Sequence, residues 1–211
     1  MKQAFYYIVI IISALLLSGC SYNELTAKQQ RVKQKWADVE SALQRRADLI
    51  PNLVSAAQMA GVQEQEVFGQ IAEARSRLLN AQQAPPAGAD GDRTPEQKQA
   101  IIEAANSFGG TIGRLLMLQE QYPQLGSIEA FKNLQVELAG TENRIKVARD
   151  DYNAAVGEYN TLRGQFPAVI TASLFGFQPE PYFQADPASR QAPTVGDPNS
   201  LRRNQSNSNT K

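Results

Sequence analysis

Two long runs of apolar side chains at alternating steps of three and four residues constrain the fold of this chain most strongly. The first run extends from Val32 to Ala60 and the second from Phe131 to Leu162. Such steps average about 3.5 residues and place one apolar seam along each helix. We therefore expect two long helices that pack lengthwise, as in a coiled coil.

Two shorter amphipathic segments, residues 63–81 and 95–121, complete the set of predicted main helices. The second has a well-defined start, because Thr94 can cap it, Pro95 suits the first helical position and Gln97 can complete a capping box. Four helices joined by short connections bury their apolar stripes most simply in an antiparallel bundle. The predicted fold class is all-α, with about four helices, two of them long.

One proline lies inside the first apolar run. Pro51 lacks the N–H that a helix interior needs, so the helix must either kink there or begin again with Pro51 in its first turn. The apolar phase continues unbroken across Pro51, which favours a kink. The sequence leaves both alternatives open.

Outside the main helices, the composition changes along the chain. Residues 168–175 are expected to form a short last helix, and residues 176–183 an extended aromatic segment that lies back on the bundle. The stretch 82–93 contains two prolines and two glycines, which predicts a flexible loop. The tail at 186–211 cannot bury enough apolar area to offset its ordering entropy, so we expect it to be disordered.

The first residues have the organisation of a bacterial secretory signal. Lys2 precedes an uncharged run, Ala4 to Leu17, and Leu17-Ser18-Gly19-Cys20 follows. Fourteen helical residues span about 21 Å, less than the roughly 30 Å hydrocarbon core of a bilayer. The tetrapeptide resembles a lipobox, in which the cysteine takes a diacylglycerol, the chain is cut, and a further acyl chain such as palmitate is added.

The lipobox resemblance predicts where the protein resides. Residues 1–19 would be a lipoprotein signal peptide and Cys20 the lipid attachment point. Several acyl chains on one residue give stable anchoring. The protein would be exported and lipid-anchored to a bacterial membrane, and in a host with two membranes the non-acidic Ser21 favours the periplasmic face of the outer membrane.

Composition excludes several classes of function. The chain has no histidine, which removes Ser/His/Asp relays, imidazole bases and histidine-ligated metals. Its single cysteine allows neither an internal disulfide nor a CxxC pair. The balance of 21 basic and 21 acidic side chains argues against a nucleic-acid partner. Carboxylates remain as acid–base candidates but form no evident catalytic pair, so we predict neither an enzyme nor a cofactor or metal.

A polar cluster surrounds Pro51 within the apolar seam. Arg46 occupies a seam position, and a guanidinium there must be paired or reach solvent. We predict that Arg46 pairs with Glu142 or Glu137 across the bundle and sets its register. The cluster is either such a structural network or a polar notch that recognises a partner. The candidate interaction residues are Arg45, Arg46, Asp48, Asn52, Glu137 and Glu142.

A Tyr-Asn pair occurs twice at a spacing of seven residues, as Tyr152-Asn153 and Tyr159-Asn160. This spacing places both tyrosines on one helix stripe and both asparagines on the next. Core packing with hydroxyls that reach polar neighbours is the favoured explanation. A sugar-binding or peptide-binding ladder is the alternative.

Several motifs, taken together and in order, resemble the LemA family. The resemblance runs from about Tyr22 to Phe183, which supports one LemA-like domain over residues 20–185. The motifs that carry it are Arg45 to Val54, Glu120 to Pro123, Glu137 to Ile145, Ala148 to Val156, Phe166-Pro167, Leu174 to Phe177 and Pro181 to Phe183. The resemblance implies a membrane-tethered, mostly helical domain that faces away from the cytoplasm, in a family without an established enzymatic activity. This chain departs from the family in its lipobox, which stands where many members resemble a transmembrane anchor.

Three functions remain for such a domain. The first is a non-enzymatic envelope lipoprotein with a structural role or a protein partner in the envelope. The second is a histidine-independent glycan hydrolase of the cell wall that uses a glutamate, which would need a cleft around a buried carboxyl group of raised pKa. The third is a sensor of a small ligand, which would need an internal cavity.

Overall fold

The structure is a computed structural model that describes residues 2–88 and 91–184, with side chains from Ser21 onward within those ranges. The predicted disordered tail at 186–211 lies outside the described residues, as do the side chains of the predicted signal peptide and of Cys20. The all-α prediction is confirmed, because the described ranges contain helices and no strand. The elements are α1 (Lys2–Met59), α2 (Gln65–Gln83), α3 (Pro95–Gln121), the 3-10 helix η2 (Pro123–Ser127), α4 (Glu129–Gly164) and α5 (Ala168–Phe175).

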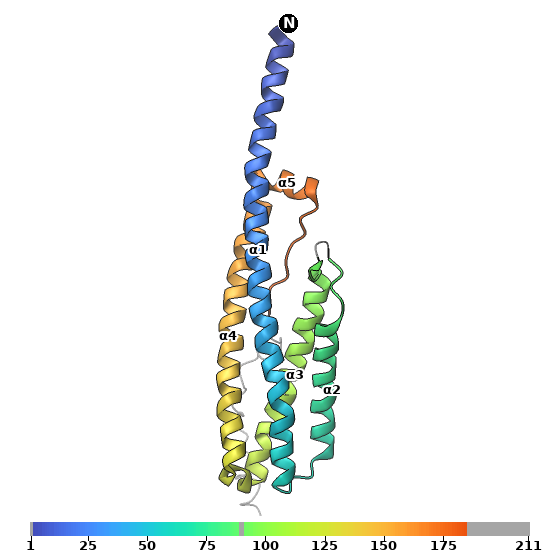
Figure 1. Cartoon of the computed structure of the whole chain (residues 1–211), viewed down its shortest axis with the longest axis vertical. Coiled ribbons are helices and arrows are strands. Elements are labelled where there is room, and N and C mark those ends of the chain that lie inside the picture. The colour runs from blue at the N-terminus through green and yellow to red at the C-terminus, as the bar shows by residue number, and fades with distance from the viewer. Residues whose placement is uncertain (1, 89–90, 185–211) are drawn as a thin grey trace, which may run out of the picture.

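The four main helices form two antiparallel pairs. The long helices α1 and α4 lie side by side, and α2 and α3 form a second pair beside them (Figure 1). The N-terminal part of α1 extends beyond the rest of the bundle, and α5 lies next to α1 at that end (Figure 1). Among the residues whose side chains the structure describes, from Ser21 onward, no helix combines the length and the apolar character needed to traverse a bilayer.

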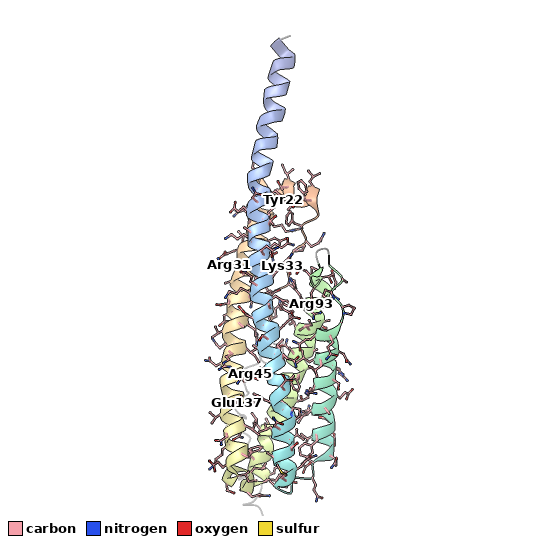
Figure 2. The ribbon with its side chains drawn as sticks, in the orientation of Figure 1. Tyr22, Arg31, Lys33, Arg45, Arg93 and Glu137 are labelled. Carbon is pink, nitrogen blue, oxygen red and sulfur yellow. The ribbon has the colours of Figure 1, made fainter. Side chains whose placement is uncertain are left out.

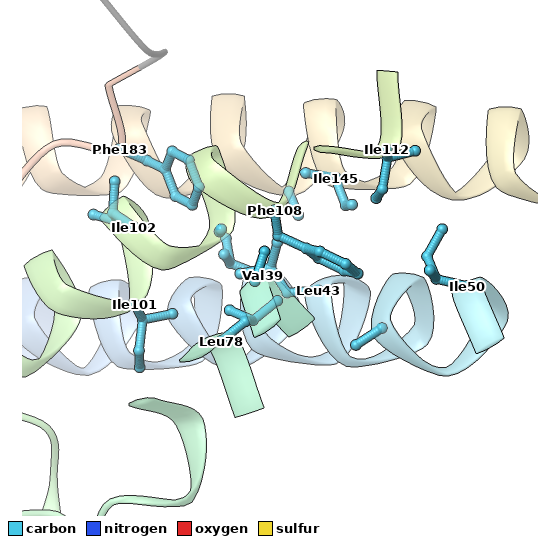
Figure 3. Close-up of a cluster of buried hydrophobic side chains, with 14 of the residues drawn as sticks. Val39, Leu43, Ile50, Leu78, Ile101, Ile102, Phe108, Ile112, Ile145 and Phe183 are labelled. Atoms are coloured by element: carbon cyan, nitrogen blue, oxygen red, sulfur yellow. The ribbon is translucent and has the colours of Figure 1, made fainter. Parts of the chain in front are cut away.

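The core forms where the predicted apolar seams meet. Val39 and Leu43 of α1 pack with Phe108 of α3 and Ile145 of α4, and Leu78 of α2 closes the cluster (Figure 3). Each of these side chains is at most 4% exposed. Burying a side chain of this size stabilises a fold by about 1.5–3 kcal/mol, so the seams supply much of the driving force for bundle formation.

The start of α3 confirms the predicted capping box. The backbone N–H of Gln97 donates to Thr94 Oγ1 over 3.2 Å, and Thr94 N–H donates to Gln97 Oε1 over 3.1 Å. The helix α2 begins two residues later than predicted and ends two residues later. The preceding turn contains Gly61, whose φ of 85° lies in the left-handed region that ends helices.

The helix α1 passes through Pro51 without interruption, so the helix does not restart there. Proline has no N–H for the carbonyl four residues earlier, which leaves the Ala47 oxygen without its helical donor. Arg75 of α2 replaces that donor, because its Nε–H donates to the Ala47 oxygen over 2.7 Å. The break in the α1 ladder therefore becomes a contact between α1 and α2.

Replacing Arg75 with methionine should lower the free energy of unfolding by about 1.5–3 kcal/mol, the usual range for a hydrogen bond to a charged donor. In a Pro51→Ala background the same replacement should cost much less, because the introduced alanine would supply the missing N–H. Urea denaturation of the four chains measures this coupling. Equal costs in both backgrounds would show that Arg75 does not serve the carbonyl that Pro51 leaves free.

Candidate functional site

A polar hollow of about 960 Å³ opens between α1 and α4. Arg45, Asp48 and Asn52 line it from α1, and Glu137 lines it from α4. The structure thus brings together four of the six candidate interaction residues. The α1 side chains share one face because they follow at steps of three and four residues.

An ion pair joins the two walls of the hollow. Arg45 Nη2 lies 2.7 Å from Glu137 Oε1, and Figure 2 shows both residues where α1 and α4 run together. The two side chains are 49% and 44% exposed. An exposed pair of this kind contributes about 0–1 kcal/mol to stability. A partner could therefore exchange this pair for contacts of its own at little energetic cost to the bundle.

The charged residues of the hollow are of both signs. Its lining carries four carboxylates and two guanidiniums, namely Asp38, Asp48, Glu137, Asp151, Arg45 and Arg144. Asp151 is also paired, since Lys35 Nζ lies 2.7 Å from its Oδ2. That contact raises the pKa of Lys35, chiefly through the hydrogen bond with Asp151. The hollow thus offers a partner charges of both signs beside apolar side chains such as Leu49 and Val147.

Arg46 and Glu142 lie apart from the hollow. The Arg46 guanidinium is buried; its Nη1 lies 3.1 Å from Glu142 Oε1, and its Nη2–H donates to the Ala105 oxygen over 2.9 Å. It also lies 5.4 Å from the centre of the Phe108 ring. The pairing with Glu142, one of the two predicted, is present and links α1 to α4, while the bond to the Ala105 oxygen links α1 to α3. This geometry fits a register contact inside the bundle.

Neither Glu137 of the hollow nor the buried Glu180 lacks a cationic partner. Glu180 is the buried glutamate of the described part of the chain, and it pairs with Lys98 rather than facing the hollow. Glu137 is exposed and paired with Arg45. Nor do three Cys, Asp or Glu side chains gather as a metal site anywhere in the described ranges.

The repeated Tyr-Asn pairs hold an extended segment of the same chain. Asn160 Nδ2 donates to the Glu180 oxygen over 2.9 Å, and Glu180 N–H donates back to Asn160 Oδ1 over 3.0 Å. Asn153 and Phe183 exchange the same two bonds at 3.0 and 2.8 Å. Each asparagine therefore satisfies both backbone groups of one residue in a segment that has no strand partner.

The spacing of the two asparagines matches the extended segment. Seven helical residues rise about 10.5 Å, and three extended residues, from 180 to 183, cover about 10 Å. The tyrosines follow the same register, because the Tyr159 and Tyr152 hydroxyls donate over 2.8 Å to the carbonyls of Gln178 and Pro181 respectively. The prediction that the aromatic segment lies back on the bundle is confirmed. The favoured explanation, core packing with hydroxyls that reach polar neighbours, is confirmed, because both tyrosines are fully buried and both hydroxyls bond to backbone carbonyls of the extended segment.

Burial changes the ionisation of both tyrosines. Desolvation raises the pKa of Tyr159 to about 12 and raises that of Tyr152 further, with a smaller contribution from the nearby Glu180 charge. Both phenols therefore ionise more easily in the unfolded chain than in the folded protein. Their contribution to the stability of the fold is complete below the unfolded pKa of about 10, and it is lost as the pH rises through the folded pKa.

We expect Tyr152 and Tyr159 to remain neutral in the folded protein at about pH 11, where an unperturbed tyrosine is ionised. Absorbance at 295 nm during an alkaline titration would show these phenols as a late component. The variants Tyr152→Phe and Tyr159→Phe should each remove part of that component. If the late component persisted in full in both variants, these tyrosines would not be its source.

The fold and its sites define a class of protein: a helical bundle with an N-terminal helical extension, a polar hollow between its long helices and a C-terminal segment clamped onto α4. The family model of the LemA family matches residues 35–196, and the chain belongs to that family.

Curated relatives share most of this length. The chain is 29% identical over 193 residues to magnetosome protein MamQ 2 of Paramagnetospirillum magneticum. The matched region covers 86% of this chain and 70% of the relative. Magnetosome protein MamQ of Magnetospirillum gryphiswaldense is 27% identical over the same shares.

Proposed function

We propose that this LemA-family protein is a non-enzymatic lipoprotein of the bacterial envelope that binds an envelope protein through the hollow between α1 and α4. The observation that carries this proposal is the exposed Arg45–Glu137 pair across the hollow, which offers charges of both signs to a partner. The lipobox-like segment that ends at Cys20 supports anchoring by lipid.

A contact role agrees better with the geometry than hydrolysis does. A glycosidase acid needs a carboxyl group whose pKa is raised by a poorly solvated site, opposite a second carboxylate across a substrate cleft. Glu137 is half exposed and lies against the Arg45 cation, and buried Glu180 is paired with Lys98. Each of these two carboxylates is therefore engaged by a cation rather than placed free in an apolar pocket.

Site-specific photocrosslinking in living cells tests the partner. A photoreactive amino acid in place of the exposed Asn52 should yield a reproducible protein adduct, whereas the same group in place of exposed Arg77 on α2 should not. Arg45→Glu should abolish the adduct, because it would place two carboxylates opposite each other. Capture of glycan alone, or identical adducts from both positions, would contradict the proposal.

Metabolic labelling with an alkyne fatty acid tests the lipid anchor. The native chain should carry the label and fractionate with membranes, and Cys20→Ser should lose the label and keep the uncleaved signal. Labelling of the serine variant would place the acyl chains elsewhere and remove Cys20 as the anchor. The crosslinking result does not depend on this outcome, so the two parts of the proposal can fail separately.

A further inference from the structure

The helix α5 is turned with its large apolar side chains toward solvent. Ile170, Leu174 and Phe175 are 59%, 77% and 58% exposed, and Phe166 just before the helix is 81% exposed. The chain carries no charged residue between Arg163 and Glu180. An exposed apolar cluster of this size marks an interaction site rather than ordinary surface.

The buried face of α5 is small and does not explain why the helix needs large residues. Ala168, Thr171 and Ala172 are at most 3% exposed and pack against the bundle. A surface helix of a water-soluble domain normally has the opposite arrangement, with large apolar side chains inward and polar ones outward. The sequence of α5 therefore suits an apolar medium on its outer side.

The position of α5 identifies that medium. The Phe175 ring lies 4.9 Å from the ring of Tyr22, and the Phe177 ring lies 5.7 Å from it. Tyr22 follows Cys20 by two residues, about 3 Å along the helix. Beyond α5, α1 continues to Lys2 through the uncharged run 4–17 (Figure 1). The bilayer surface would lie at the level of α5 in either case, whether acyl chains on Cys20 or the uncharged run 4–17 itself enters the membrane.

We propose that α5, together with Phe166, lies in the surface of the lipid bilayer with its outer face among the lipid headgroups and upper acyl chains. The inference rests on the membrane anchoring in the proposed function. An interfacial helix sits about 5–10 Å into this boundary, where aromatic and aliphatic side chains are favoured. With the N-terminal anchor, α5 gives the bundle a second point of attachment and so fixes its orientation relative to the membrane.

Tryptophan quenching by lipids tests this contact on the full chain. The protein is expressed in bacteria, purified from membranes and reconstituted into phosphatidylcholine–phosphatidylglycerol vesicles, with or without bromine on the acyl chains. Leu174→Trp places a reporter on the outer face of α5. Val136→Trp is the matched control, because Val136 is also exposed, at 74%, but lies on α4 about 42 Å of helix from Gly164. Native Trp36 is buried in the bundle and gives a constant background.

Brominated lipid should reduce the added fluorescence of Leu174→Trp by about twofold, as expected for an indole within the interface, and leave Val136→Trp unchanged. Vesicle flotation in the same samples reports anchoring. A chain that fails to float with vesicles would contradict the proposed anchoring. A chain that floats while Leu174→Trp is unquenched would overturn the inference about α5 alone, and would point to a protein on that face. Equal quenching of both reporters would mean that the bundle lies flat on the bilayer, which also overturns it.

Discussion

Replacing Lys98 with methionine should lower the free energy of unfolding by about 3–5 kcal/mol, the cost of breaking a buried ion pair from one side. Lys98 Nζ lies 2.7 Å from Glu180 Oε2, and the two side chains are 3% and 8% exposed. Without the ammonium group, the Glu180 carboxylate would remain buried without its cationic partner. The substitution also removes a contact with Trp36, because the Lys98 ammonium lies 5.9 Å from the centre of the Trp36 ring.

Urea denaturation monitored by circular dichroism measures this loss, and two further variants sharpen it. The double variant Lys98→Met/Glu180→Leu should recover most of the stability, because an apolar pair of similar volume needs no ionic partner. Lys146→Met is the matched control, since Lys146 and Asp150 form an exposed pair, 74% and 66% exposed, that contributes less than about 1 kcal/mol. Similar losses in Lys98→Met and Lys146→Met would show that burial does not strengthen the dependence on this pair.

The Lys98–Glu180 pair shows where prediction from sequence stops. The bounds of α3 could be predicted because the cap, the proline and the apolar period are local signals. Glu180 reaches Lys98 from 82 residues away, so no local pattern could connect them. A usable signal was nevertheless present: Glu180 is the one charged residue among the aromatics of the 176–183 segment, which should have suggested a cationic partner.

Arg46 and Arg75 show that a side-chain bond to a backbone carbonyl is equally hard to predict from sequence. The pairing of Arg46 with Glu142 could be predicted, because a charge in an apolar seam requires an opposite charge from the facing seam. Its bond to the Ala105 oxygen, and the bond of Arg75 to the Ala47 oxygen, could not, because every residue offers a carbonyl. For Ala47 a physical signal existed, since Pro51 four residues later had to leave that oxygen without a donor.

The candidate site divides in a way that sequence spacing did not show. Arg45 and Arg46 are neighbours in the chain, yet Arg45 opens to the hollow and Arg46 points into the bundle. One residue turns a helix by about 100°, so adjacent side chains need not share a face. The polar notch predicted as one cluster is therefore an exposed hollow on one side and the buried Arg46 with its contacts to α3 and α4 on the other.

Removing the side chains of Asn153 and Asn160, which bond the backbone of the extended C-terminal segment, should release that segment from the bundle. In Asn153→Ala/Asn160→Ala, the backbone N–H and C=O of Glu180 and of Phe183 lose their partners. Four bonds at about 0.5–1.5 kcal/mol each predict a loss of about 2–6 kcal/mol if the segment stays, which favours its detachment. Detachment would also expose the tyrosine hydroxyls that bond to it.

Hydrogen exchange followed by mass spectrometry measures the release, as a loss of protection in peptides that contain residues 178–183. Asn143→Ala is the control, because Asn143 is an exposed asparagine on the same helix. In Asn160→Asp, the carboxylate oxygen can still accept the Glu180 N–H, but the donor to its carbonyl is lost, so an intermediate loss of protection is expected. Unchanged protection in the double variant would mean that the tyrosines and the Lys98–Glu180 pair suffice to hold the segment.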